Sequence, residues 1–424
     1  MFTSARRGAL TALGAAAALA LTLTACSSGG AGAAGTTPTP VATAGADISG
    51  TVTFWHAYSA DSPEVKTLET VLIPKFEQAH PKVKVDAVAV PYDQLHQKLV
   101  TAVAGDTLPD LVRSDIMWVP ELANLGVLVP LDQQLPDFST FAGQVYPGAL
   151  ATNAYKGHYY GLPLDTNTRV LLYNKDALAK AGITQPPATF DELKADAPKL
   201  TAAGVYAFAD NSTSGWNVLP WIWSAGGSVT DDKVTKVQLL VDLYKQKAIP
   251  DIILGGTGGT ATSDGLATGA YGTILDGPWM YPIFQSQYPD FKLQAAPMPS
   301  GPGGSVSVVG GESVVMTQSS KNKDAAAEFM RFLLSQDSQY EMAKVGQMSV
   351  LSALGDKLVG INAYYAPFVK QLANAQPRTP TPAWPKIDDI LKAQIQKALQ
   401  GEPVQQALDE AAAQIDPLLA QYAG

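Results

Sequence analysis

Tryptophan and aspartate residues follow several predicted strands of this chain, where their side chains could contact a ligand. Trp279 comes three residues after Asp276, and Trp55 is followed closely by Tyr58 and Asp61. A sugar has apolar C–H faces and a rim of hydroxyl groups, so its site needs flat aromatic rings beside carboxylates and amides. Both groups of residues therefore favour carbohydrate binding.

Five of the seven tryptophans fall at a predicted strand end, a helix start or a turn flanked by Gly or Pro: Trp55, Trp118, Trp216, Trp279 and Trp384. Exposing an indole at a turn is unfavourable unless packing or a ligand covers the ring. Packing in the core is an equal alternative for any one of them, but a weaker explanation for all five. The other two, Trp221 and Trp223, lie within an apolar run, and we expect both in the core.

Acidic side chains leave an enzymatic alternative open. Two carboxylates at a suitable separation form the catalytic pair of a glycoside hydrolase. Four acids could face one cleft: Asp115, Asp165, Asp276 and Glu312. The same carboxylates could instead accept hydrogen bonds from sugar hydroxyls or cap helices. The catalytic and phosphate-binding motifs GxSxG, HExxH and GxxxxGK[ST] do not occur in the sequence.

Metal and cofactor patterns are weak. The four histidines show no paired metal-ligand spacing, and only His56 falls at a predicted strand end beside an aromatic residue. Residues 256–261 fit the loose glycine pattern of dinucleotide sites, but no acidic residue follows at the required spacing. We interpret that segment as a loop and expect neither a metal nor an organic cofactor.

Strand and helix patterns alternate in the first part of the chain. Strands are predicted at 51–55, 83–90 and 108–114, and helices at 62–80, 92–104 and 118–125. This alternation predicts a parallel sheet covered by helices. Ligands of such sheets bind beyond the carboxyl ends of the strands, which directs attention to residues 55–61, Pro91-Tyr92 and 114–118.

The later part of the chain repeats this organisation. Strands are predicted at 170–173, 271–275 and 306–316, and helices at 190–203, 323–334, 338–345, 386–399 and 404–421. At roughly 150 residues per domain, 424 residues leave room for two α/β lobes. We expect the chain to cross between the lobes more than once.

The composition excludes several classes of protein. With 46% hydrophobic and 16% charged residues the chain is globular and not intrinsically disordered. Its 29 Lys+Arg against 38 Asp+Glu give a net charge of −9, which argues against a general nucleic-acid binder and mildly against anionic ligands. A single cysteine excludes a disulfide scaffold, a cysteine-based zinc site and a thiol redox pair.

The N-terminus has the order of a secretory signal. Arg6 and Arg7 precede an apolar run over 9–23, which is too short for a convincing membrane span. We therefore predict a signal peptide over 1–25. Residues 26–48, mostly Gly, Ala, Ser, Thr and Pro, are predicted to form a flexible tether.

Cys26 directly follows Leu23-Thr24-Ala25, a quartet that resembles the lipobox of bacterial lipoproteins. In those proteins the cysteine becomes the acylated first residue of the mature chain. Two or three acyl chains would anchor the protein firmly. The resemblance implies an extracytoplasmic protein held on the outer face of the cell membrane; an incidental buried thiol is the alternative.

Six motifs occur in a fixed order along residues 50–400: 54–58 (FWHAY), 109–112 (PDLV) before Asp115, 161–176 from GLP to LYNKD, 277–279 (GPW), 310–311 (GG) and 326–333 (AAEFMRFL). Their order and spacing resemble the extracellular solute-binding lipoproteins of carbohydrate ABC importers, the maltose-binding-protein-like family. The resemblance implies an α/β, two-lobed periplasmic-binding-protein fold. Each lobe would be a mostly parallel sheet flanked by helices, with the ligand cleft between the lobes.

The same resemblance implies the lobe boundaries and the function. Residues 49–167 plus 313–351 would form the N-terminal lobe, and residues 168–312 plus 352–424 the C-terminal lobe. The chain would be a monomer without enzymatic activity that captures a di- or oligosaccharide and delivers it to the permease subunits of an ABC importer. No cofactor is implied.

Ligand contacts are carried over by matching position. The resemblance implies contacts from Asp115, Asn167, Trp216, Trp279, Gly311 and Trp384. Arg378 resembles the arginine that donates to ligand hydroxyls in some disaccharide-binding members. The predicted site is completed by Trp55, Tyr58, Asp61 and Asp276.

Overall fold

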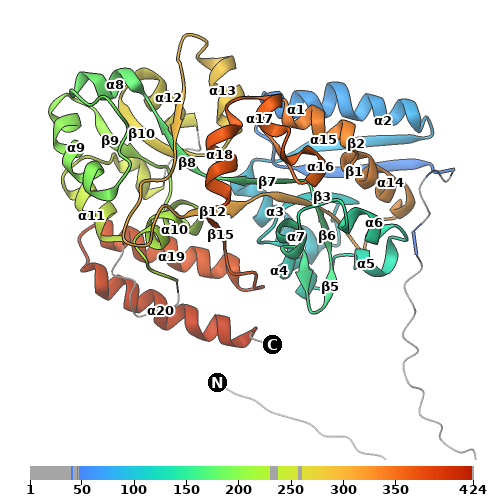
Figure 1. The fold of residues 1–424 in the computed structure, drawn as a ribbon. Coiled ribbons are helices and arrows are strands. Elements are labelled where there is room, and N and C mark those ends of the chain that lie inside the picture. The colour runs from blue at the N-terminus through green and yellow to red at the C-terminus, as the bar shows by residue number, and fades with distance from the viewer. Residues whose placement is uncertain (1–39, 42–44, 46, 230–236, 256–259, 423–424) are drawn as a thin grey trace, which may run out of the picture. The chain divides into compact units, whose positions relative to one another are not determined.

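A computed structural model describes residues 40–41, 45, 47–229, 237–255 and 260–422 (Figure 1). The predicted signal peptide, Cys26, most of the predicted tether and residues 256–259 of the glycine-rich segment lie outside the described residues. In the part that is described, no helix is both long enough and apolar enough to span a membrane.

A five-stranded sheet contains most of the first predicted strands. Its order is β2 (Val83–Ala89), β1 (Gly50–His56), β3 (Leu111–Asp115), β13 (Glu312–Met316) and β6 (Gly161–Pro163). The first three strands are parallel, whereas β13 is antiparallel to both of its neighbours. The register places Glu312 of β13 opposite Asp115 of β3, at the edge where the parallel strands end.

Successive residues of β1 contribute to different cores, as the alternation of a strand requires. Phe54 packs with the helices of one face, and Trp55 with those of the other. The covering helices are α3 (Tyr92–Gly105), α4 (Val119–Asn124), α14 (Lys323–Leu333), α15 (Gln336–Ala343) and the run α1 (Pro63–Thr67), η1 (Leu68–Leu72) and α2 (Ile73–Ala79).

The helix predicted over 62–80 is helical throughout but contains one wide turn. The Ile73 N–H bonds to the carbonyl of Leu68, five residues back. Pro74 follows and has no N–H to continue the usual pattern, which explains the wide turn at this point. Ser62 caps the start, since its side chain accepts a hydrogen bond from the Val65 N–H at 3.2 Å.

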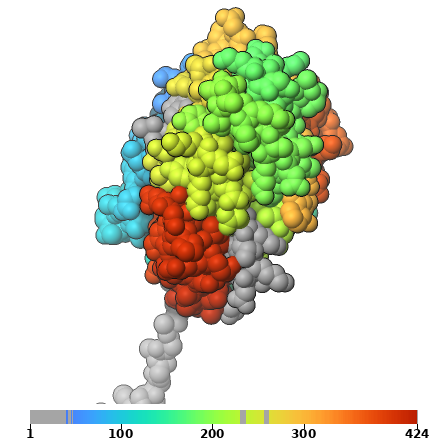
Figure 2. All heavy atoms as spheres, turned by 90° about the vertical axis from the view of Figure 1, so that its left-hand side faces the viewer, coloured from blue at the N-terminus to red at the C-terminus, as the bar shows by residue number. Residues whose placement is uncertain are grey.

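A second sheet has the order β11 (Gln294–Ala296), β8 (Val170–Tyr173), β10 (Tyr271–Asp276) and β9 (Tyr206–Ala209). Its surrounding helices are α8 (Lys175–Lys180), α9 (Phe190–Ala202), α10 (Gly215–Ser224), α11 (Gln238–Lys245), η3 (Asp251–Leu254), α12 (Thr260–Thr268), α13 (Met280–Gln287), α19 (Trp384–Leu399) and α20 (Val404–Gln421). Figure 2 shows the C-terminal helices, in red, as one block beside the green and yellow segments of this sheet region.

A third, four-stranded sheet connects the other two. Its order is β14 (Met348–Ser349), β7 (Asp165–Thr168), β12 (Ser307–Gly310) and β15 (Ala375–Pro377). Strand β7 continues from β6 of the first sheet into β8 of the second, and β12 runs from β11 of the second sheet into β13 of the first (Figure 1). We refer to this sheet as the hinge sheet.

Gly311 divides the strand predicted over 306–316 into β12 and β13. Its φ is 141°, in the region that favours glycine, and a Cβ here would collide with the carbonyl oxygen of Asp165. The chain can therefore change sheets at this residue only because it has no side chain.

The sheets are mixed, which corrects the expectation of mostly parallel sheets. Only β2–β1–β3 in the first sheet and β10–β9 in the second are parallel. Strands β8 and β13, which run against these parallel strands, are the ones that enter their sheets from the hinge sheet. Within each sheet, the βαβ units enter their strands from one end of the sheet. A strand that arrives from the hinge sheet enters from the opposite end and therefore runs in the reverse direction.

Shorter elements complete the chain: α5 (Leu131–Gln134), α6 (Phe138–Ala142), α7 (Pro147–Ala151), β4 (Ala154–Tyr155), β5 (His158–Tyr159), α16 (Ser352–Gly355), α17 (Leu358–Ile361) and α18 (Tyr365–Leu372). Tyr365 and Phe368 of α18 are buried against Leu172 of β8 and its neighbours.

Candidate functional site

Asp115 is the last residue of β3, and three groups converge on its buried carboxylate. Oδ1 accepts a hydrogen bond from the Met117 N–H at 2.7 Å, and Oδ2 accepts one from the Tyr92 hydroxyl at 2.6 Å. Arg378 Nη2 lies 3.2 Å from Oδ1. A carboxylate held in this way can accept hydrogen bonds but has little freedom to rotate.

Tyr92 is a contact that the sequence prediction did not include in the site. It is the first residue of α3, its ring lies 5.3 Å from that of Trp118, and 47% of the residue is exposed. The signal was present, because Tyr92 directly follows the second predicted strand, at one of the positions where a ligand is expected.

Arg378 follows β15 of the hinge sheet and is buried. Besides its ion pair with Asp115, its guanidinium carbon lies 5.5 Å from the ring centre of Trp216, within the range of a cation–π contact. Its Nε has no hydrogen-bond partner among the described residues. This N–H is therefore a buried donor without a protein acceptor in the described part of the chain.

Trp216 and Trp279 form a partly exposed aromatic pair. Their ring centres are 6.3 Å apart and their planes are inclined by 30°. Trp216 is the second residue of α10, and Trp279 precedes α13. The Trp216 ring lies so close to Gly310 of β12 that a Cβ there would be 2.6 Å from it. The sequence analysis assigned both rings to one site, although the two residues are 63 positions apart.

Asp276, Asn167 and Gly311 lie around this pair. Asp276 ends β10 and accepts a hydrogen bond from the Gly277 N–H at 2.8 Å, and burial raises the pKa of its carboxyl to about 6. Asn167, on β7, is paired with Gly310 in the register, and its buried Oδ1 has no partner in the described part of the chain. The Gly311 carbonyl accepts a hydrogen bond from the Ile116 N–H at 3.3 Å, next to Asp115.

Trp384 lies beside the aromatic pair but is only 3% exposed, in a core with Val218 and Leu219 of α10. Asp388, one turn along α19, accepts a hydrogen bond from the Gly215 N–H at 2.6 Å, and burial raises the pKa of its carboxyl to about 6. Nothing in the local sequence distinguishes Asp388 from a solvated helix residue, and the sequence prediction did not include it.

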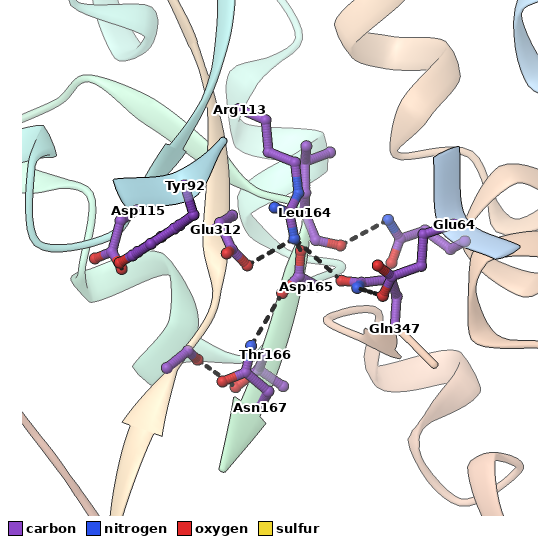
Figure 3. A network of polar contacts seen from close by, with 12 residues as sticks. Glu64, Tyr92, Arg113, Asp115, Leu164, Asp165, Thr166, Asn167, Glu312 and Gln347 are labelled. Carbon is purple, nitrogen blue, oxygen red and sulfur yellow. Dashed lines mark hydrogen bonds and ion pairs between the residues drawn. The ribbon is translucent and has the colours of Figure 1, made fainter. Parts of the chain in front are cut away.

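A second polar network surrounds Arg113 at the centre of Figure 3. Arg113 Nη2 lies 2.7 Å from Glu312 Oε2, 3.0 Å from Asp165 Oδ2 and 3.3 Å from Gln347 Oε1. Gln347 in turn donates to Glu64. Burial raises the pKa of Glu64 to about 7 and that of Glu312 well above its usual range, although Arg113 opposes both shifts.

Three residues of the predicted site lie away from the aromatic pair. The Tyr58 ring stacks under Arg113, whose guanidinium carbon is 4.1 Å from the ring centre. Trp55 packs below α3, with Lys98 Nζ at 4.0 Å. Asp61 is exposed in a turn with a φ of 59°. The structure therefore does not bring Trp55, Tyr58 and Asp61 together with Asp115 and Trp216.

His56, the histidine that falls at a strand end, is fully buried next to Tyr58. Burial and the charge of Arg113 lower the pKa of its imidazole to about 4. The described residues contain no group of three or more His, Cys, Asp or Glu side chains that could hold a metal ion. What the site offers is aromatic surface, two aspartates, an arginine donor and an amide acceptor.

Comparison with known proteins gives a consistent result. Residues 31–340 match the family model described as bacterial extracellular solute-binding protein. A protein of Brucella abortus (strain 2308) that is named as a binding protein is 31% identical over 365 residues, which are 81% of this chain and 88% of that protein. A lipoprotein of Streptomyces antibioticus is 27% identical over 325 residues, 70% of each chain.

Solved structures have the same fold. The GacH receptor of Streptomyces glaucescens, solved without ligand and in complex with acarbose, superimposes with a TM-score of 0.78 at 27% identity. The match covers 88% of this chain and 100% of the receptor. The mixed α/β architecture, with two sheets joined by hinge strands, is thus the two-lobed fold expected from the sequence. This chain belongs to the family of bacterial extracellular solute-binding proteins.

Proposed function

We propose that the protein captures an extracellular di- or oligosaccharide between its two lobes and delivers it to an ABC-type importer. The N-terminal lobe would consist of residues 49–167 plus 313–351, and the C-terminal lobe of residues 168–312 plus 352–424. The GacH receptor binds acarbose, as does the maltose-binding protein with which it was compared, and this supports a sugar ligand here.

The observation that carries the proposal is the aromatic pair Trp216–Trp279 beside the Asp115–Arg378 ion pair. Indole faces cover the apolar C–H surface of a sugar, while a carboxylate and a guanidinium bond to its hydroxyls. Arg378 Nε and Asn167 Oδ1 have no hydrogen-bond partner among the described residues. They add one donor and one acceptor to the polar groups of the proposed site. Such an alternation of flat and polar surface suits a neutral polyhydroxylated ligand.

Lobe closure would follow from the way these groups are distributed. Asp115 belongs to β3 of the first sheet, whereas Trp216 belongs to α10 and Trp279 directly precedes α13, two helices of the second sheet region. A ligand that contacts both sets binds the closed form better than the open form. A preference of several kcal/mol is enough to convert a mostly open population into a mostly closed one. The permease subunits would then recognise the closed form.

We further propose that the protein is a monomer anchored through acylated Cys26 to the outer face of the cell membrane. The order of charged, apolar and small residues before Cys26 supports this, and so does the similarity to a Streptomyces lipoprotein. Incorporation of labelled palmitate in wild type, and its loss in Cys26→Ser, would test the anchor. Labelling that persists in the variant would contradict it.

Hydrolysis is the alternative left open by the sequence, and the geometry disfavours it. Asp115 is bound to Arg378 and Tyr92, and both Glu312 and Asp165 to Arg113, so three of the four candidate carboxylates already have a guanidinium partner. We propose that the protein is not an enzyme and needs no cofactor. Incubation with its bound sugar should return the sugar intact, and shorter products would overturn this part of the proposal.

Calorimetric titration with a panel of neutral disaccharides tests the binding proposal. We expect Trp279→Ala to weaken the best ligand about tenfold or more, because the aromatic platform is lost. Trp223→Ala is the matched control, since Trp223 is half-buried against the core of the same lobe. It should leave the affinity within about twofold. Equal affinities of Trp279→Ala and wild type would refute the assignment of this site.

A further inference from the structure

We propose that Arg169 is a positioning residue of the ligand site, which sets the place of Trp216 and of the end of β10 through one buried guanidinium. The inference rests on the proposed function, because it assumes that Trp216 contacts the ligand. It goes beyond that function by assigning the orientation of the site to a residue that the ligand does not touch.

Arg169 occupies the single position between β7 of the hinge sheet and β8 of the second sheet. Its side chain is 3% exposed. Its backbone is fixed as well, since the Arg169 carbonyl accepts a hydrogen bond from the Ser307 hydroxyl of β12 at 2.7 Å. The side chain of Arg169 therefore extends from a backbone position that is hydrogen-bonded to β12, the other strand that crosses between the sheets.

Three segments that carry the site meet at this guanidinium. Nη2 lies 3.1 and 3.0 Å from the two carboxylate oxygens of Asp210, which follows β9. Nη2 also donates to the carbonyl of Leu275, the residue before Asp276. Nη1 donates to the carbonyl of Trp216 at 3.3 Å. One group thus joins the ends of β9 and β10 to the start of α10.

Asp210 extends this control to the first turn of α10. Asn217 donates from its side-chain amide to Asp210, and Ser214 donates from its hydroxyl to the Asn217 amide oxygen at 2.6 Å. Ser214 makes no capping hydrogen bond to the helix backbone, although it occupies the N-cap position. The first turn of α10 is therefore held by two links, one through Asp210 to Arg169 and one from the Gly215 N–H to Asp388 of α19.

The Trp216 ring is close to two cations that come from different segments. The guanidinium carbon of Arg169 lies 5.8 Å from the ring centre and that of Arg378 lies 5.5 Å from it. Arg378 pairs with Asp115, whereas Arg169 pairs with Asp210. Arg169 thus holds the ring from the side of the second sheet, and Arg378 belongs to the ligand-contacting set.

A lysine cannot reproduce this arrangement. The guanidinium is a planar fork with five donors, and here it serves a carboxylate and two carbonyls at once, whereas an ammonium on a flexible stem is a single point of charge. Arg169→Lys retains the charge next to Asp210, so the variant should remain folded. Asp210→Asn, which retains the shape of the partner, weakens the same link from the other end.

The test is a double-mutant cycle on ligand affinity. Arg169→Lys, Trp216→Ala and the double variant are titrated with the best disaccharide, and urea unfolding of each is followed in parallel. We expect Arg169→Lys to weaken binding about tenfold, and Trp216→Ala to weaken it at least as much. The double variant should lose less affinity than the product of the two single losses, because Arg169 acts in part through that ring.

Arg331→Lys is the matched control, since Arg331 is a buried arginine paired with Asp137 and Glu328 in the first sheet region. It should lower stability without changing affinity. Multiplicative losses in the double variant, or unchanged affinity of both Arg169→Lys and Asp210→Asn, would overturn the inference. If Trp216→Ala binds as well as wild type, the proposed ligand site fails instead, and the two failures are therefore distinguishable.

Discussion

Arg113 and Arg378 are both buried arginines paired with carboxylates, but their surroundings differ. Arg113 of β3 bonds to Glu312 of the paired strand β13 and to Asp165 of β7, the strand that continues from β6 of the same sheet, and Gln347 links it to Glu64 (Figure 3). Arg378 follows β15 of the hinge sheet and reaches Asp115 of β3, with which β15 is not paired. The first network joins strands within and directly continuous with the first sheet, and the second bridges segments that would separate in the proposed opening of the lobes.

The difference shows that burial alone does not determine whether an ion pair stabilises the fold. A charge left alone in the Arg113 network stays in the protein interior, where desolvation is severe. A charge left alone at Asp115 can regain water if the lobes open. On the proposed function, the same chemistry stabilises the fold in one place and would be available to a ligand in the other.

The largest effect is expected for Arg113→Met. Removing this cation leaves Asp165, Glu312 and Glu64 without it, and breaking a buried ion pair costs about 3–5 kcal/mol. Urea unfolding should show a loss of that size in the free energy of unfolding. Lys84→Met, which breaks the exposed Lys84–Glu77 pair, is the control and should cost less than about 1 kcal/mol. If Arg113→Met lowered the free energy of unfolding as little as the control does, the network around Arg113 could not be closed to water.

Glu64→Gln should change how stability depends on pH. Burial raises the pKa of Glu64 from 4.5 to about 7, so the folded state holds the proton more tightly than the unfolded state. Its contribution to stability is complete below pH 4.5 and is lost as the pH rises through 7, by roughly 3 kcal/mol in all. Glu64→Gln should therefore be more stable than wild type at pH 8 and similar to it near pH 4.5. Parallel pH profiles of the two proteins between pH 4.5 and 8 would exclude this shift.

The smallest effect on stability is expected for Arg378→Ala. Asp115 keeps its hydrogen bonds from Met117 and Tyr92 and gains water, so the free energy of unfolding should fall by no more than about 1 kcal/mol. Affinity for the best disaccharide should nevertheless fall about tenfold, because a charged donor is lost. Unfolding and calorimetry on the same sample separate the two quantities. A loss of stability comparable to that of Arg113→Met would mean that Asp115 is enclosed too.

Much of the fold was predictable from local pattern. The predicted strands and helices at β1, β2, β8, β10, α9 and α20 agree with the structure to within one residue at each end. Each of these elements has either a run of apolar or β-branched residues or a clear helical period. The hinge strands β14 and β15 were not predicted, since two or three residues are too few to show a period.

Some of the predicted site residues come together in the structure and others do not, and the difference has a physical explanation. Asp115, Trp216, Trp279 and Arg378 come together although they are far apart in sequence. Trp55 does not join them, because β1 continues to His56 and the strand alternation directs Trp55 under α3. Arg169 and Asp388 could not be recognised, since their roles depend on partners from distant segments.

The position of β13 has a consequence for how the chain is made. Arg113 and Glu312 are 199 residues apart, and β13 lies between β3 and β6 in the first sheet. A nascent polypeptide therefore cannot complete this sheet until residue 316 has left the ribosome, and until then β3 presents an open edge. The first sheet is therefore incomplete until most of the chain has been synthesised.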